Sequence, residues 1–517
     1  MANFLDMLKR VFNPIVAIQQ ASQAVNRNDP TSITDRMLND LALAEAIYMD
    51  EPPWLNEESP PLTATGVGSL AAMEIACMIT IEAKISVNDN DEIDDIIQSF
   101  LMPNLRMEIE KGWALGGLIF KPYYNNAVFT LDSSNNIIGV DGKLKLAFLY
   151  PSEFIIEEAD NSGAILSIKF FDTVVENHKF YTRVEHQLYD EVTRALTITN
   201  TVYRTTVSPT KYKWDNLGSD IVSLDSIDQW KNMLPKMTFQ NVSGCLVGYF
   251  RPAVANNSDL NSPYGLSPLV RARHALRRVD RAANGLDWEL DTTQARLYVD
   301  ERAMIGTETL STKLARHVTK LIGDNDKKFF EIFSPEIRHN SYVRILNTYL
   351  RQAEDAIGLA RGTLSDVGEV SRTATEIAKT KQRTYVTIVD NQQNLEIGVR
   401  QLVRAIQVWL APTVVEEEPS QTYDFDDSVV SNPQEQLALY MILQNAGNIP
   451  AWKTNMMYFN ASEEEAKEMF EEAQIDQRER LLNKDIGTSS TKIRRTTANN
   501  TVAVEEIPPV NPIIPIM

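Results

Sequence analysis

The sequence has few of the residues on which many enzymes and most small secreted proteins depend. It contains only two cysteines and five histidines in 517 residues. Two cysteines make no disulfide framework, and Cys77 lies in an apolar helical pattern, so we expect Cys77 and Cys245 to be buried free thiols. No histidines are paired at helical spacing or lie near a cysteine. These absences argue against a zinc enzyme and a disulfide-rich secreted fold.

Long apolar runs and a phosphate-binding loop are missing as well. The longest apolar stretch, residues 70–81, is interrupted by Glu74 and Thr80 and is too short to cross a bilayer. Residues 1–16 are amphipathic with internal charges, unlike a secretory signal. No Gly-x-x-x-x-Gly-Lys-Ser/Thr run occurs, which removes the nucleotide loop of a motor ATPase. We therefore expect synthesis in the cytoplasm, no membrane, no cofactor, no metal and no catalytic site.

Two weaker motifs have competing interpretations. Residues 66–71, GVGSLA, match a dinucleotide-binding fingerprint, but a proline-rich loop precedes them instead of a strand. A glycine-rich entry into a helix is the simpler explanation. Residues 89–95, DNDEIDD, lack the glycine and the distal glutamate of a calcium loop. We interpret them as an acidic helix start, where the carboxylates meet the positive end of the helix dipole.

The charge balance limits the mode of any DNA contact. The formal net charge is −20, so the chain has no excess of Lys and Arg with which to wrap DNA. An acidic wall repels phosphate and would still let DNA slide past it. Solubility alone is the other explanation, and composition does not separate the two.

Hydrophobic periodicity predicts an α+β chain. Helical patterns cover residues 37–48, 92–100 and 105–115, and residues 66–87 are predicted as a helix that runs into a short strand at 83–87. After a short strand at 83–87, the period changes to two from residue 116 onward, and turns such as Asp141-Gly142 separate the strands. The predicted strands are residues 118–124, 128–131, 144–150, 154–157, 165–172, 180–189, 195–205 and 242–251.

The longest predicted element is a helix over residues 371–410, roughly 60 Å long at 1.5 Å per residue. Apolar residues recur at intervals of three and four, Gly398 is its only glycine, and Thr373 and Glu376 have capping-box spacing. Residues 362–370, GTLSDVGEV, precede it as a glycine-bounded loop that we expect to bend and project. A long rod behind such a loop indicates a large assembly.

Two further predicted helices, residues 269–292 and 341–361, bracket a small α/β insert. Within the insert we expect strands at 296–304 and 328–333 and a helix at 310–321. A strand at 422–430 and about three helices in 432–480 follow. Residues 487–517 are polar and then proline-rich, without periodicity.

The helix at 269–292 carries its arginines before its acids. This order opposes the helix dipole, which favours the reverse by ~0.3–1 kcal/mol per residue. Either the arginines form ion pairs, with Glu354 and Asp355 as candidate partners within or between subunits, or they contact phosphate. Both interpretations imply packing among identical subunits. The basic residues are Arg271, Arg273, Arg277, Arg278 and Arg281.

Five stretches together point to a family. They are residues 110–124 (EKGWALGGLIFKPYY), 181–186 (YTRVEH), 198–203 (ITNTVY), 262–268 (SPYGLSP) and 371–377 (SRTATEI). In this order and spacing they resemble the portal (head–tail connector) proteins of tailed bacteriophages, of the type found in long-tailed phages and prophages of Gram-positive bacteria. The resemblance covers roughly residues 30–480.

The resemblance implies a portal fold assembled as a ring, typically of twelve subunits, at one capsid vertex. Double-stranded DNA would be packaged and ejected through its channel. The implied parts are a wing (1–261), a first stem helix (262–294), a clip (295–339), a second stem helix (340–362), a tunnel loop (363–370), a long wing helix and strand (371–431), a helical crown (432–482) and a tail of unassigned role (483–517).

The same resemblance implies residence in the virion after synthesis in the bacterial host. It implies docking of terminase, of major capsid and scaffolding proteins, and of head-completion or tail adaptor proteins. We expect Leu364, Asp366, Val367 and Glu369 to form the channel constriction. The tunnel-loop residues are Thr363, Leu364, Ser365, Asp366, Val367, Gly368, Glu369 and Val370. The alternatives are an oligomeric scaffold or adaptor without a nucleic-acid role, and a nucleic-acid-processing enzyme.

Overall fold

The structure is a computed structural model that divides into two compact units, residues 1–426 and 427–517. It describes residues 33–57, 59, 61–132, 136–160, 162–209, 214, 217–293, 296–300, 318–321, 330–333, 338–366, 374–412, 419–425, 440–442, 444, 449–459 and 462–475. The predictions for residues 1–32, 310–317, 367–373 and 476–517 lie outside this set, as does the side chain of Glu376.

A group of helices forms the base of the first unit. α2 (Asp35–Tyr48), α3 (Val67–Thr80) and α5 (Leu105–Leu115) lie within a residue or two of their predicted bounds. The Thr34 hydroxyl accepts a hydrogen bond from the Met37 amide at 3.3 Å and caps α2. α4 (Asp91–Ile96) continues into the π-helical η2 (Ile97–Leu101) and, with β1 (Lys84–Val87), joins the same main core.

Both weaker motifs are part of this helical base. Gly66, in the left-handed conformation, is the N-cap of α3, and a Cβ on Gly68 would come within 2.7 Å of the Ile47 side chain. Close packing of α3 on α2 therefore accounts for the glycines, and the adjacent cavity measures only about 10 Å³. The acidic stretch begins α4, as predicted, with the Asn90 side chain as its cap.

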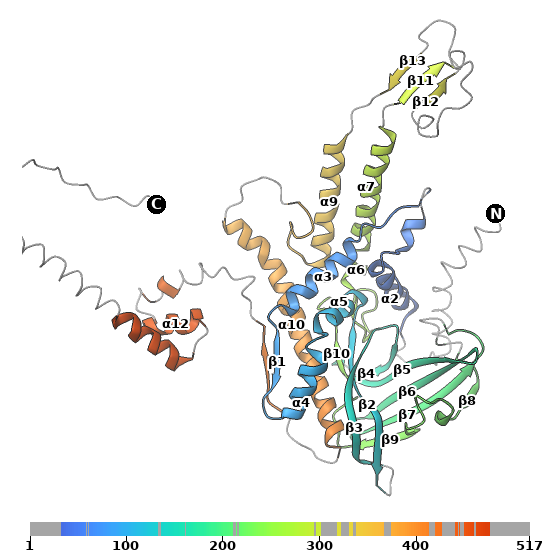
Figure 1. Cartoon of the computed structure of the whole chain (residues 1–517), viewed down its shortest axis with the longest axis vertical. Coiled ribbons are helices and arrows are strands. Elements are labelled where there is room, and N and C mark those ends of the chain that lie inside the picture. Colours follow the sequence, from blue (N-terminus) through green and yellow to red (C-terminus); the bar gives the residue numbers. More distant parts are fainter. Residues whose placement is uncertain are drawn as a thin grey trace, which may run out of the picture. The chain divides into compact units, whose positions relative to one another are not determined.

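Two antiparallel sheets form the β region (Figure 1). One has the order β10-β2-β3, from β2 (Leu118–Leu131), β3 (Ile137–Leu149) and β10 (Gly248–Phe250). The other has the order β4-β5-β6-β7-β8, and β9 also pairs with β7. Its strands are β4 (Phe154–Ala159), β5 (Ile165–Glu176), β6 (Lys179–Asp190), β7 (Ala195–Thr205), β8 (Asp220–Val222) and β9 (Lys236–Gln240).

The β region differs from the prediction at several points. The two strands expected before residue 132 are one strand, β2, with a bulge between Asn125 and Val128. The turn expected at Asp141-Gly142 is wrong, because β3 runs through it and pairs with β2 on both sides. The sequence pattern missed β8 and β9, which are short and depend on pairing with β7. Only residues 248–250 of the strand expected at 242–251 are strand.

α10 (Ala374–Leu410) is the central helix of the first unit. Leu395, Val399 and Leu402 on its apolar stripe are fully buried, which contributes roughly 1.5–3 kcal/mol for each side chain. The single glycine predicted in this helix, Gly398, has a steric reason. A Cβ on Gly398 would come within 3.1 Å of the Tyr249 backbone on β10, and a Cβ on Gly248 would come within 2.2 Å of the Gly398 carbonyl oxygen, so strand and helix backbones are in direct contact.

α7 (Arg273–Thr292) and α9 (His339–Ile357) lie side by side (Figure 1). The helix predicted at 269–292 is divided at Ala272 into α6 (Pro268–Arg271) and α7. The chain segment that connects α7 to α9 contains a three-stranded sheet. Its strands are β11 (Arg296–Asp300), β12 (Val318–Leu321) and β13 (Phe330–Phe333). The helix predicted at 310–321 is therefore wrong for residues 318–321, which pair in parallel with β11.

The remaining elements are short. β14 (Gln421–Asp424) pairs antiparallel with β1 across more than 330 residues of sequence. The second unit contains α12 (Ala451–Phe459) and a helix over residues 463–475. Cys77 and Cys245 are free thiols, as expected, but are only partly buried. Within the described part of the chain, no helix is long and apolar enough to span a bilayer.

Candidate functional site

The connection from α9 to α10 begins at a glycine that both helices require. Gly358 ends α9 with a φ of 96°, and its amide and that of Leu359 both donate to the Glu354 carbonyl at 2.9 Å. A Cβ on Gly358 would come within 2.7 Å of the Thr387 hydroxyl on α10, and that hydroxyl donates to the Gly358 carbonyl at 2.9 Å. The chain therefore turns in direct contact with α10.

The carboxylate of Glu354 binds the first part of the predicted tunnel loop. Its Oε1 accepts hydrogen bonds from the amides of Gly362 (3.1 Å), Leu364 (2.6 Å) and Ser365 (2.8 Å). Its Oε2 accepts the Ser365 hydroxyl at 2.8 Å. Glu354 is fully buried. Converging backbone amides form a nest that stabilises a buried anion without a cation in contact.

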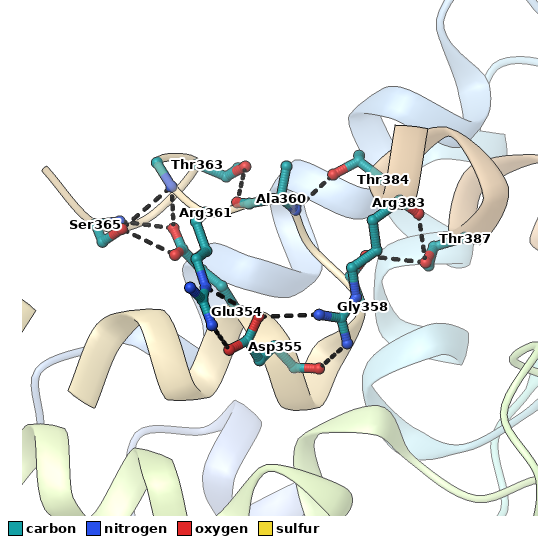
Figure 2. Close-up of polar contacts among 11 residues, drawn as sticks. Glu354, Asp355, Gly358, Ala360, Arg361, Thr363, Ser365, Arg383, Thr384 and Thr387 are labelled. Atoms are coloured by element: carbon teal, nitrogen blue, oxygen red, sulfur yellow. Dashed lines mark hydrogen bonds and ion pairs between the residues drawn. The ribbon is translucent and has the colours of Figure 1, made fainter. Parts of the chain in front are cut away.

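Asp355, the next residue, ties the loop to α10 through two arginines (Figure 2). Its carboxylate forms ion pairs with Arg361 at 2.7 Å and with Arg383 at 2.9 Å. Arg383 also donates to the Asp355 carbonyl at 2.5 Å. The hydrogen bond from Arg361 lowers the pKa of Asp355, against the opposing effect of burial. Both arginines are more than half exposed, so each pair stabilises weakly.

Further contacts hold residues 360–366 against both helices. The Ala360 amide donates to the Thr384 hydroxyl at 2.6 Å, and the Asp366 amide donates to the Asn347 side chain at 2.8 Å. Arg351 donates to the Asp366 carbonyl at 3.2 Å. Residues 360–366 are thus bound to both α9 and α10.

We expected residues 362–370 to bend and project, and the described part, residues 362–366, packs against α9. Ser365 is buried, and Leu364 is partly buried against the main core. Of the four expected constriction residues, only Asp366 is described and exposed. Val367, Gly368, Glu369 and Val370 lie outside the described residues. The sequence pattern showed the bounding glycines but not the buried glutamate that holds the loop.

The arginines of the first stem helix find other partners than the acids proposed from sequence. Arg273 pairs with Asp40 of α2 at 3.3 Å, and Arg277 pairs with Glu57 at 2.7 Å. Among the residues that the structure describes, Glu354 and Asp355 do not pair with the α7 arginines. Their carboxylates bind the loop and the arginines that flank it.

The other three arginines differ in their surroundings. Arg278 donates to Gln352 of α9 at 3.1 Å, and its guanidinium lies over the Tyr349 ring. Arg281 is exposed and interacts with another group of the protein. Arg271 is exposed and has no partner among the described residues. Arg271 is thus the residue of the set most available to a neighbour or to phosphate.

A cluster on the larger sheet was missed from sequence. His186 Nε2 lies 2.9 Å from the Ser167 hydroxyl and 3.1 Å from the Glu157 carboxylate, and Lys169 also pairs with Glu157. Burial alone raises the pKa of Glu157, but hydrogen bonds from His186 and Lys169 lower it to about 2. Serine and carboxylate share one ring nitrogen, whereas a catalytic triad uses opposite nitrogens. The sequence signal that could have revealed this cluster was the alternation of its polar residues along adjacent strands.

Neither the described side chains nor the comparisons with known proteins assign this chain a metal site or a family. In the described residues, no group of three or more His, Cys, Asp or Glu side chains is placed to hold a metal ion. No protein-family model matches the sequence, and no curated protein matches it.

Several solved structures are similar to this chain, and one of them matches it at low identity. It is described as the virion of a native gene transfer agent (GTA) particle. The match has 10% sequence identity and a TM-score of 0.42, and it covers 86% of this chain and 98% of the other. A match at this TM-score and identity assigns no function to this chain.

Proposed function

We propose that this chain is a virion structural protein and, more specifically, the portal subunit of a tailed bacteriophage. In this proposal identical subunits close into a ring, and double-stranded DNA passes through its centre. The chain itself supplies no catalysis and no cofactor. Terminase, capsid, scaffolding and head-completion proteins would dock on the ring at different stages.

One observation carries the proposal, namely the binding of a short loop between two helices of different length. α9 leads into the loop, and Glu354 and Asp355 at its end bind residues of the segment 361–366. α10 follows the loop and packs against the β region. A loop that must meet passing DNA needs a rigid support, because a mobile one would be displaced. The order of elements around it agrees with the order of motifs that resemble portal proteins.

Charge supports passage of DNA more than tight binding. A net charge of −20 leaves few sites for phosphate, and Arg273 and Arg277 are already paired with acids of the same chain. In this proposal Arg271 is left for contact with DNA or with a neighbouring subunit.

Electron microscopy of the purified full chain tests the proposal. Averaged end-on views should show a closed ring with a central hole wide enough for duplex DNA. Monomers, or closed particles without a hole, would contradict it.

The same images test a second candidate function, an oligomeric scaffold or adaptor without a nucleic-acid role. The intrachain pairing of Arg273 and Arg277 favours it, because these cations are then structural. A scaffold predicts an assembly whose subunits leave no continuous channel.

A further inference from the structure

The segment between α2 and α3, residues 51–65, binds to α7 and is called the strap below. It contains four prolines and the short 3-10 helix η1 (Pro53–Asn56). Three side chains of α7 contact it, namely Arg277, Asp280 and Asn284. Their spacing of three and four residues places them on one face of the helix. One face of α7 is thus used to hold a segment of the helical base.

Asp280 makes most of the contacts with the strap. Its Oδ2 accepts the Trp54 indole N–H at 2.8 Å. Its Oδ1 accepts the Thr65 amide at 2.9 Å and the Thr65 hydroxyl at 2.7 Å. Asp280 is 5% exposed, and the cavity beside it measures about 10 Å³, which is room for one water molecule at most. The buried carboxylate therefore depends on the strap for its hydrogen bonds.

Asn284, one turn further along α7, holds the main chain of the strap. Its Oδ1 accepts the Thr63 amide at 2.8 Å, and its Nδ2 donates to the Thr63 carbonyl at 2.7 Å. Arg277 pairs with Glu57 at 2.7 Å, but both side chains are about half exposed, so this pair stabilises weakly. Asp280 and Asn284 are therefore the main points of attachment.

α7 meets the helical base at a break in its helix. Ala272, with a φ of −86° and a ψ of −1°, separates α7 from the short α6. On the base side of the break, Leu269 and Val270 of α6 are buried. Interruptions of the helical hydrogen-bond series are the places where helices bend. Asp280 lies roughly two turns beyond the break, where a contact resists bending effectively.

α9, which lies beside α7, has a related arrangement at its own end. It stops at Gly358 in the left-handed conformation, and its buried Glu354 accepts amides of residues 362–365. Each helix of the pair thus has a break next to the base and a buried carboxylate that binds a neighbouring segment. The contact of Asp280 joins segments more than 200 residues apart in the sequence, whereas that of Glu354 is local.

We propose that the strap is a conformational device that fixes the orientation of α7 on the helical base. Asp280 is its latch, and Ala272 is the hinge. While Asp280 binds Trp54 and Thr65, the first turns of α7 stay closed on the base, and when the strap detaches they open about Ala272. The inference does not depend on a ring or on DNA, because all of these contacts lie within one chain.

Hydrogen exchange of the full chain, measured by mass spectrometry, tests the proposal with Asp280→Ala. Exchange of the Thr65 amide should be at least about tenfold faster, because this amide loses its acceptor. Exchange should also be at least about threefold faster at Ala275 and Leu276, whose amides donate to the Ala272 carbonyl at 2.8 and 3.0 Å. Exchange in β6 should not change.

Two further variants make the result specific. Asp287→Ala is the matched control, since Asp287 is an exposed acid of the same helix and none of the strap contacts involves it. It should leave exchange unchanged at Thr65 and at Leu276. Asp280→Asn keeps the shape of the side chain and one acceptor oxygen, so exchange at both places should quicken less than in Asp280→Ala.

Faster exchange at Thr65 alone would overturn the proposal, because the apolar packing of Leu276 would then hold α7 without the strap. Unchanged exchange at both places in Asp280→Ala would overturn it as well, and so would faster exchange in Asp287→Ala. If Asp280→Ala unfolds the chain, so that β6 also exchanges quickly, Asp280→Asn decides by the same comparison of Thr65 with Leu276.

Discussion

Two buried glutamates in different parts of the molecule are stabilised in different ways. Glu354, at the end of α9, accepts three backbone amides and one hydroxyl. Glu185, on β6, faces two cations, Lys121 and Arg183, and the amide of Gln187. Both are almost inaccessible to solvent, at 0% and 8% exposure.

The difference shows what each carboxylate does. Glu354 determines the path of a loop, because its partners are the main-chain amides of Gly362, Leu364 and Ser365. Glu185 pairs with Lys121 of β2 and with Arg183 of its own strand β6, and so links the two sheets. Burial and these cations also have opposite effects on its titration. Burial alone raises the pKa of Glu185, but Lys121 and Arg183 lower it to about 2.

The largest effect is expected from breaking the ionic pair. Glu185→Leu leaves Lys121 buried beside Arg183 and should reduce the free energy of unfolding by about 3–5 kcal/mol. Adding Lys121→Met should recover part of the loss, because the uncompensated charge is removed. Urea unfolding of the two single variants and the double variant gives the coupling energy. Additive losses would mean that the two charges do not interact.

A smaller and more local effect is expected at Glu354. Glu354→Ala removes the acceptor of three amides, but residues 362–366 can regain water, so we expect a loss of about 1–3 kcal/mol. Hydrogen exchange should quicken at Leu364 and Ser365 and not in the β region.

Two further variants sharpen the result for Glu354. Glu354→Gln keeps one carbonyl oxygen and should lose about half as much. Arg383→Ala, which breaks a half-exposed ion pair of the same connection, should cost about 0–1 kcal/mol. Unchanged exchange at Leu364 in Glu354→Ala would show that the helices alone hold the loop.

Glu157 is an intermediate case, partly exposed and bound to Lys169 and His186. Its pKa is lowered from 4.5 to about 2 in the folded chain. The stabilisation is therefore present above the unfolded value and is lost as the pH falls from 4.5 towards 2. We expect Glu157→Gln to lower stability by about 1 kcal/mol at neutral pH, and the difference from the unaltered chain to vanish near pH 2. Thermal melts across this range measure it, and a constant difference would contradict the assignment.

Much of the fold was predictable because its signals are local. α2, α3 and α10 follow from apolar spacing, and most β strands follow from alternation. Residues 318–321 were predicted wrongly, because pairing with β11 decides their conformation. The turn at Asp141-Gly142 was wrong for a related reason, since pairing with β2 overrides local turn propensity.

The candidate site was predictable only in part. The loop after α9 follows from its bounding glycines, and the arginines of α7 follow from their order along the helix. Their partners did not follow, because Asp40 and Glu57 are more than 200 residues away in the sequence.

By itself the sequence determined the helices, the strands, the acidic balance and the single glycine of the long helix. Each of these depends on residues close together in the chain or on composition. Only the tertiary structure decided that Glu354 would bind a loop instead of an arginine. The physical reason is burial, because the strength and the partner of a polar group depend on neighbours that folding brings together.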